Sequence, residues 1–113
     1  MKKYVEPHLK YMLGDLAILK QRLPQSKDKF MADGVLQDAM LMRLIDVGEQ
    51  LIHIREKFPE FYQINENETW HKLIGLRNII AHGYHEVDND TIWNIVAAKL
   101  DGLEDQLQTL LKG

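Results

Sequence analysis

The sequence predicts an all-α protein, an antiparallel bundle of four or five helices. Apolar residues recur at helical steps of three and four in several separate segments, nothing alternates between apolar and polar with a period of two, and turn-forming residues separate the segments. At 113 residues, with 45% apolar and 27% charged residues, the chain suits one globular domain, which we expect to span residues 1–113.

The composition excludes several classes of protein. No stretch is apolar for long enough to span a membrane, and the N-terminal lysines are not followed by the apolar core of a signal peptide. The sequence has no cysteine, which excludes thiolate catalysis and Cys-ligated zinc and is typical of a cytoplasmic protein. The net charge of -3 provides no overall attraction to nucleic acid, so any such binding requires a local patch. We therefore expect a cytoplasmic protein without a membrane role.

The first half of the chain predicts two long helices. Residues 5–23 carry one apolar stripe, with Pro24 just past the end, which predicts about five helical turns. A polar turn follows, and residues 33–58 then carry two adjoining stripes, which predict a central helix with more than one neighbour. Gly48 in the second stripe would let another helix approach closely, and Pro59 ends the segment.

The second half predicts two more helices. After the turn-rich residues 59–69, Asn67 or Thr69 is expected to cap a helix over residues 70–82. A last helix is predicted from Asp88, its N-cap, to the C-terminus. Its apolar residues repeat at helical steps and are Ile92, Val96, Leu100, Leu103, Leu107 and Leu111.

Arg77 is out of place in the third predicted helix, because it lies near the middle of the apolar arc. A buried guanidinium needs a partner, so one interpretation is a structural arginine paired with Glu49 or Asp46, or one that reaches the surface. Taken alone, His82 fits an exposed or capping residue at a helix C-terminus, and Tyr84 fits packing.

The spacing of Arg77 and His82 limits how they can act together. Five residues of a regular helix rotate by about 140°, so the two side chains cannot share a face of an unbroken helix. Either the helix loosens near Ala81 to Gly83, where glycine permits it, or the two residues meet across a second copy of the chain. A two-fold interface would supply two copies of each residue, enough for acid–base chemistry.

Residues 77–84, RNIIAHGY, fit the pattern R-N-x-x-x-H-x-Y, and through it the chain resembles the HepT-like branch of the HEPN ribonuclease toxins. The surroundings are similar too: QDAMLMRLIDVGEQL resembles the long helix of that family with its Gly-Glu pair, TWHKLIGLRN the approach to the motif, and VDNDTIWNIV the start of the last helix. Thr69 replaces the usual proline before the tryptophan, which concerns the helix cap and not the chemistry.

The resemblance implies a HEPN-like helical domain that forms a two-fold homodimer with the motif in an interface cleft. It implies a metal-independent endoribonuclease without a cofactor, the toxin of a type VII-like toxin–antitoxin system. The implied partner is a minimal nucleotidyltransferase antitoxin, which silences the toxin by transferring AMP to the motif tyrosine, Tyr84 here. The alternative is a non-enzymatic helical dimer that is only the substrate or substrate-binding partner of such a nucleotidyltransferase.

The residue types suit RNA cleavage without a metal. A base must take the proton of the 2′-hydroxyl and an acid must protonate the departing 5′-oxygen; histidine suits either step because its ordinary pKa is about 6.5. Arg77 and His82 are therefore the predicted catalytic pair, with Arg77 holding phosphate oxygens. Asn78 would orient the histidine or the sugar. Tyr84 would position a phosphate, and AMP on it would add bulk and negative charge there.

Two other groups carry weaker hypotheses. Glu49 and His53 have the i, i+4 spacing of two metal ligands, but no second pair accompanies them, so we expect a solvated ion pair and no metal site. His71, Lys72 and His85 flank the motif and could form the local basic patch that RNA binding requires. Acidic residues close in sequence favour mixed surface charge instead.

Overall fold

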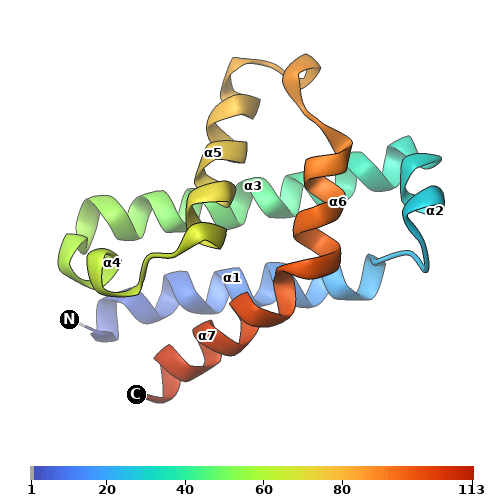
Figure 1. Cartoon of the computed structure of the whole chain (residues 1–113). Coiled ribbons are helices and arrows are strands. Elements are labelled where there is room, and N and C mark those ends of the chain that lie inside the picture. Colours follow the sequence, from blue (N-terminus) through green and yellow to red (C-terminus); the bar gives the residue numbers. More distant parts are fainter. Residues whose placement is uncertain (1) are drawn as a thin grey trace.

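The long helix α3 is the centre of the molecule. The structure is a computed structural model that describes the backbone of residues 2–113 and the side chains of residues 3–83 and 85–113. In it, α3 (Gly34–Lys57) runs antiparallel to α1 (Lys2–Arg22), as Figure 1 shows. Because α3 also packs against α2, α4 and α5, the prediction of a central helix with several neighbours is confirmed.

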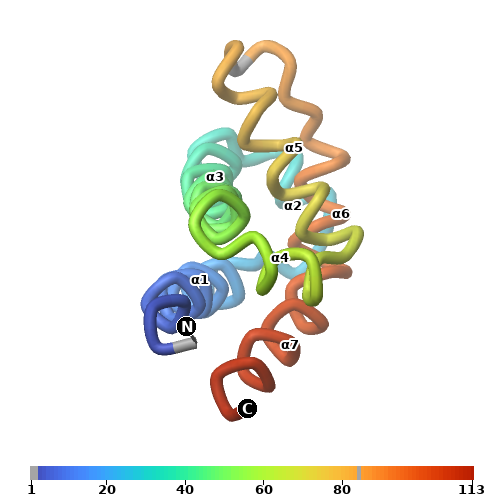
Figure 2. Tube along the Cα trace, turned by 90° about the vertical axis from the view of Figure 1, so that its left-hand side faces the viewer, coloured from blue at the N-terminus to red at the C-terminus, as the bar shows by residue number. Residues whose placement is uncertain are grey.

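The other helices surround this pair. They are α2 (Lys27–Met31), α4 (Pro59–Asn65), α5 (Glu68–His82), a 3₁₀ turn (Tyr84–Glu86), α6 (Asn89–Ala98) and α7 (Leu100–Lys112). In Figure 2, which looks along α1 and α3, α5 and α6 run across that pair, while α7 returns to pack against α1. The described residues contain no strand, so the all-α prediction is confirmed. No described helix is long and apolar enough to cross a membrane.

The predicted limits of the long helices agree with the structure to within a turn. Helix α1 ends at Arg22, so Leu23 lies beyond it and is exposed, contrary to the predicted stripe. Asp33 caps α3 by accepting a hydrogen bond from the Leu36 backbone at 3.0 Å, and Asp88 caps α6 as predicted.

Two short helices replace predicted turns. Ser26 caps α2 by accepting a bond from the Lys29 backbone at 3.2 Å, and the helix buries Phe30. Pro59 ends α3 as predicted but also opens α4, since proline fits the first position of a helix. Each helix is only a turn or two long and contributes one buried aromatic side chain, so its stability comes from tertiary packing and leaves no periodic pattern in the sequence.

The predicted last helix is two helices. The chain bends at Lys99, which ends α6 and begins α7. No proline or glycine marks that residue; the bend allows α6 to pack against α2 while α7 packs against α1. The apolar stripe continues across the bend, with Leu100, Leu103 and Leu107 buried. The prediction of one continuous helix was therefore wrong, although its buried face was right.

Helix α5 is fixed at its N-terminal end by Trp70, which is fully buried. The Trp70 indole N–H donates to Oε1 of Gln106 on α7 at 2.9 Å, and the Gln106 amide donates to the backbone oxygen of Asn65 at 2.9 Å. The Asn67 side chain caps α5 by accepting a bond from the Trp70 backbone at 3.0 Å, as predicted. The start of the motif helix is thus tied to α4 and α7.

Helices α3 and α5 touch closely at Gly48. A Cβ atom placed on Gly48 would lie 2.7 Å from the backbone oxygen of Leu73 and 2.9 Å from Cβ of Arg77. Because backbone cannot move away as a flexible side chain does, only glycine fits, and the predicted close approach is confirmed. The contact brings Arg77 against the residue that follows Gly48.

Asp15 is a buried carboxylate in the groove between α1 and α3. Its side chain accepts a hydrogen bond from Arg43 through Oδ1 at 3.3 Å, while no donor among the described residues reaches Oδ2. Burial first, and the neighbouring Asp46 second, raise the pKa of Asp15 from 3.8 to about 7.

This pKa makes stability depend on pH. Because the folded-state pKa is the higher one, the folded state binds more protons between about pH 4 and pH 7, and the free energy of unfolding falls as pH rises through that range. Asp15→Asn keeps an acceptor for Arg43 and removes the charge. We expect it to raise the free energy of unfolding by about 1–2 kcal/mol above pH 7 and to flatten the pH dependence.

Urea unfolding of both proteins at mildly acidic and mildly alkaline pH measures this effect. Asp105→Asn, a change at an exposed aspartate of α7, is the control and should leave the pH dependence unchanged. An Asp15→Asn protein less stable than the wild type at alkaline pH would contradict the expectation.

Candidate active site

The motif residues lie on the last two turns of α5 and just beyond it. The helix continues without interruption through Arg77 and ends at His82. Gly83 follows with φ 138°, a backbone conformation that favours glycine, and its N–H donates to the backbone oxygen of Ile80 at 3.0 Å. The helix therefore breaks after His82, not between the two predicted catalytic residues.

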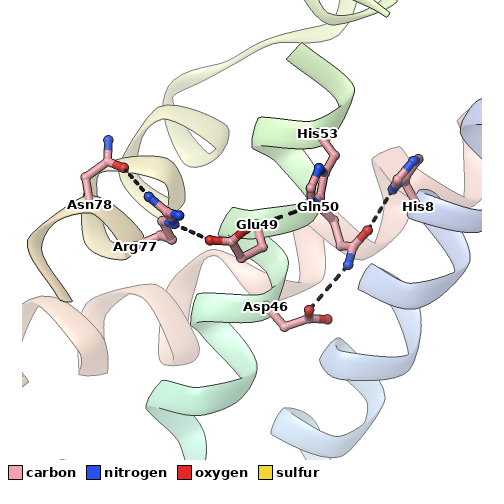
Figure 3. Close-up of polar contacts among 7 residues, drawn as sticks. All are labelled: His8, Asp46, Glu49, Gln50, His53, Arg77 and Asn78. Atoms are coloured by element: carbon pink, nitrogen blue, oxygen red, sulfur yellow. Dashed lines mark hydrogen bonds and ion pairs between the residues drawn. The ribbon is translucent and has the colours of Figure 1, made fainter. Parts of the chain in front are cut away.

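Arg77 turns toward α3 and pairs with Glu49. Its Nε donates to Oε1 of Glu49, and its Nη1 donates to Oδ1 of Asn78 at 3.3 Å (Figure 3). The side chains of Arg77 and Glu49 are 34% and 32% exposed, so the ion pair is half-buried. The prediction of a paired arginine is confirmed with Glu49 as the partner, and Asp46 is not used.

A chain of polar side chains continues from Glu49 to α1. The second carboxylate oxygen of Glu49 lies 3.9 Å from Nε2 of His53. The ring of His53 stacks on the ring of His8, with 5.9 Å between the ring centroids. His8 is also hydrogen-bonded to Gln50 at 2.7 Å, and Gln50 donates to Asp46 at 3.3 Å (Figure 3). Sequence analysis missed His8 and Gln50, because residues on different helices, 42 positions apart, share no local pattern.

His82 lies on another side of α5. Since the helix is regular from Arg77 to His82, the two side chains point in directions about 140° apart. Arg77 faces α3, whereas His82 is exposed. The structure thus brings Arg77 together with Glu49, His53 and Asn78 but does not bring His82 to them within one protomer.

Tyr84, the predicted supporting residue and AMP acceptor, has a described backbone, which begins the 3₁₀ turn. Its side chain lies outside the described residues, so the prediction of its role stays a prediction. It follows Gly83, the break in α5, and is two residues beyond His82.

The charges beside the motif are mixed. His71 contacts Glu66 at 2.7 Å, and Lys72 contacts Glu68 at 3.2 Å. His85 is exposed. Two of the three predicted basic-patch residues thus have acidic neighbours, which favours the mixed-charge alternative over a dedicated basic patch.

The described residues contain no group of three or more histidine and acidic side chains arranged to hold a metal ion. Glu49 and His53 are close, but Glu49 is already engaged by Arg77. What the cluster offers is an oriented guanidinium: a carboxylate holds one edge, and donors remain on the exposed part of the group. Such a group can bind an anionic oxygen at two points.

Residues 12–110 match the family described as Ribonuclease HepT-like, and the chain belongs to that family. No solved structure matches the chain significantly.

Curated relatives carry ribonuclease names. The chain is 26% identical over 111 residues to "Putative RNase TTE0752" of Caldanaerobacter subterraneus subsp. tengcongensis, covering 97% of this chain and 96% of the relative. It is 23% identical over 113 residues to "Gamma-glutamylcyclotransferase and putative RNase MJ0434" of Methanocaldococcus jannaschii, where it covers 99% of this chain but spans only 50% of the relative. "Putative RNase MJ1380" of the same organism is 28% identical over 85 residues, 72% of each chain.

The Arg77–Glu49 pair predicts a measurable stability difference. Glu49→Ala leaves a half-buried guanidinium without its carboxylate, and we expect the free energy of unfolding to fall by about 1 kcal/mol or more. Glu49→Gln keeps an acceptor oxygen, so its free energy of unfolding should fall less than that of Glu49→Ala. Glu68→Ala, which breaks the exposed pair with Lys72, is the matched control and should change stability by less than about 0.5 kcal/mol. Urea denaturation compares the three variants; equal effects of Glu49→Ala and Glu68→Ala would contradict a positioned pair.

Proposed function

We propose that the chain is a metal-independent endoribonuclease, one HepT-like domain over residues 1–113, that works as a two-fold dimer. Arg77 and His82 at the dimer cleft form its catalytic pair. The observation that carries the proposal is the half-buried Arg77, held by Glu49 with part of its guanidinium open, in a chain that belongs to a ribonuclease family.

The outer face of α3 supports the dimer. Val35 and Met42 are 82% and 68% exposed, and they lie seven residues apart, on one line of the helix. Seven residues further along the same line is Glu49, the partner of Arg77. Exposed apolar side chains that lead to a half-buried ion pair suit an interface between copies. A second copy on this face would put the motif arginine at the edge of a shared cleft.

A dimer would also explain how Arg77 and His82 can act together although they lie on different sides of α5. Within one protomer Arg77 and His82 point in different directions, so a site that uses both takes them from different copies. In the cleft, His82 takes the proton of a 2′-hydroxyl, the 2′-oxygen attacks the adjacent phosphorus, and the bond to the 5′-oxygen breaks. Arg77 stabilises the extra negative charge on the phosphate. A water molecule, acting as the acid, protonates the departing 5′-oxygen.

An RNA cleavage assay in excess EDTA tests the activity. We expect the wild type to yield fragments with 5′-hydroxyl ends, and His82→Ala to be slower by about 100-fold or more. His85→Ala, a change at the exposed histidine three residues further on, is the control and should cleave normally. Equal cleavage by wild type and His82→Ala would remove His82 from the site. A wild type without any activity would favour the non-enzymatic dimer that only binds a nucleotidyltransferase.

We further propose that the protein is a cytoplasmic toxin whose antitoxin is a minimal nucleotidyltransferase that modifies Tyr84. In that reaction the phenolic oxygen of Tyr84 attacks the α-phosphorus of ATP, loses its proton, and releases pyrophosphate. The adenylyl group would add bulk and negative charge two residues from His82, where RNA phosphates must lie. The motif resemblance supports this regulation.

Intact mass after co-expression with the nucleotidyltransferase tests the modification. We expect the mass to rise by an adenylyl group, and RNA cleavage to fall with it. Tyr84→Phe should stay unmodified, while Tyr11→Phe, a change at an exposed tyrosine of α1, should be modified like the wild type. Adenylylation that persists in Tyr84→Phe would exclude Tyr84 as the acceptor.

A further inference from the structure

A hollow of about 330 Å³ lies between α5 and α6. Both helices run across α3 in Figure 1, and both contribute residues to the lining of the hollow. Among its lining residues are Gly75, Leu76 and Ile79 on α5 and Asn94, Ile95 and Lys99 from the α6 side. Its size is at the lower end for small-molecule sites, which suits one nucleotide-sized group.

Gly75 keeps this hollow open. Apart from its chain neighbours and the backbone of its own helix, no atom of the described residues would lie within 4 Å of a Cβ atom placed on Gly75. Glycine in a helix interior lowers helix stability, and here no close packing contact requires it, in contrast to Gly48. The missing side chain leaves Ile79, which is 40% exposed, open to whatever enters, while Leu76 and Ile95 form the almost fully buried bottom of the hollow.

The wall of the hollow carries positive charge. Lys99, at the bend between α6 and α7, is half-buried, and Lys72 reaches the hollow from α5. Lys72 contacts Glu68, but this pair is exposed, with Glu68 77% accessible, and a phosphate can replace so weak a partner. Asn94 and Thr91 add hydrogen-bonding groups. An aliphatic floor with two ammonium groups and an amide complements a base and its phosphate.

The hollow adjoins the proposed catalytic histidine. Ile79 and His82 are three residues apart on α5, so their Cβ atoms are about 5–6 Å from each other along the helix surface. On the helical projection His82 lies on the same outward side of α5 as Gly75 and Ile79, whereas Arg77 faces α3. A strand cleaved at His82 can therefore place a neighbouring nucleotide in the hollow.

We propose that the hollow between α5 and α6 is a subsite for one nucleotide of the RNA substrate, adjacent to the bond that is cut. The base lies against Ile79 in the space that Gly75 leaves open, and Lys99 and Lys72 hold the phosphates of the nucleotide. This inference rests on the proposed ribonuclease function and adds the part of the surface that selects the substrate.

The test fills the hollow without disturbing the fold. Binding of a fluorescein-labelled single-stranded RNA of mixed sequence is measured by anisotropy in the His82→Ala background, so that cleavage does not interfere. Gly75→Leu should weaken binding by about fivefold or more while leaving the melting temperature equal or higher. Gly14→Leu, the same change at an exposed glycine of α1 with open space around it, should leave binding unchanged.

Two further measurements distinguish the contacts made to the base from those made to the phosphate. Lys99→Gln should reduce the slope of log affinity against log salt by about 0.7, the value for one phosphate contact in a single strand, whereas Gly75→Leu should not change the slope. The matched control is Lys57→Gln at the end of α3. RNA with abasic nucleotides should bind more weakly than normal RNA to the parent protein, and Gly75→Leu should remove most of that difference.

The outcomes distinguish this subsite from the proposed function. If wild type cleaves RNA but Gly75→Leu and Lys99→Gln bind it like their controls, the subsite is wrong and the ribonuclease stands. If the wild type does not cleave RNA while both variants still weaken RNA binding, the ribonuclease is wrong and the nucleotide site stands.

Discussion

The contact between Arg77 and Glu49, made where α5 crosses α3, is the interaction on which the motif depends. It is possible because Gly48 has no side chain, so that the backbone of α5 comes against α3 and a Cβ on Gly48 would lie within 2.9 Å of Cβ of Arg77. A charged group is then half-buried, and the cost of burying it is offset mainly by the carboxylate beside it. The pair, the Gly48 contact and the buried Trp70 and Leu73 together fix the rotation of α5 about its axis, and the other motif residues of the helix take their direction from that rotation.

One consequence is that α5 serves two surfaces. The side that carries Arg77 belongs to a polar cluster on α3, which reaches His8 on α1 through His53. The outward side carries His82, Ile79 and the hollow bounded by α6. A regular helix cannot present both sides to one phosphate within one protomer. The proposed ribonuclease therefore needs residues from two copies of the chain. In the proposed subsite its substrate extends along the outward side of α5 toward α6.

Much of the fold could be predicted because its signals are local. A helix that buries one side leaves apolar residues at steps of three and four, and Asp33, Asn67 and Asp88 cap their helices through bonds to backbone groups two or three residues away. The close approach at Gly48 could be predicted for a similar reason, since a glycine in an apolar stripe leaves room for the backbone of a neighbouring helix. The motif was recognised through its resemblance to a known family, and its spacing showed that Arg77 and the motif histidine cannot share a face of an unbroken helix.

The sequence by itself thus determined the long helices, their caps, the family and an arginine that needs a partner. Only the tertiary structure decided that the partner is Glu49, 28 residues away, and not Asp46. It also decided that the chain bends at Lys99, where no residue type indicates a break, and that residues of α5 and α6 line a hollow beside Gly75. These choices depend on which distant surfaces meet when the core is packed, and residues that meet in that way leave no periodic trace along the chain.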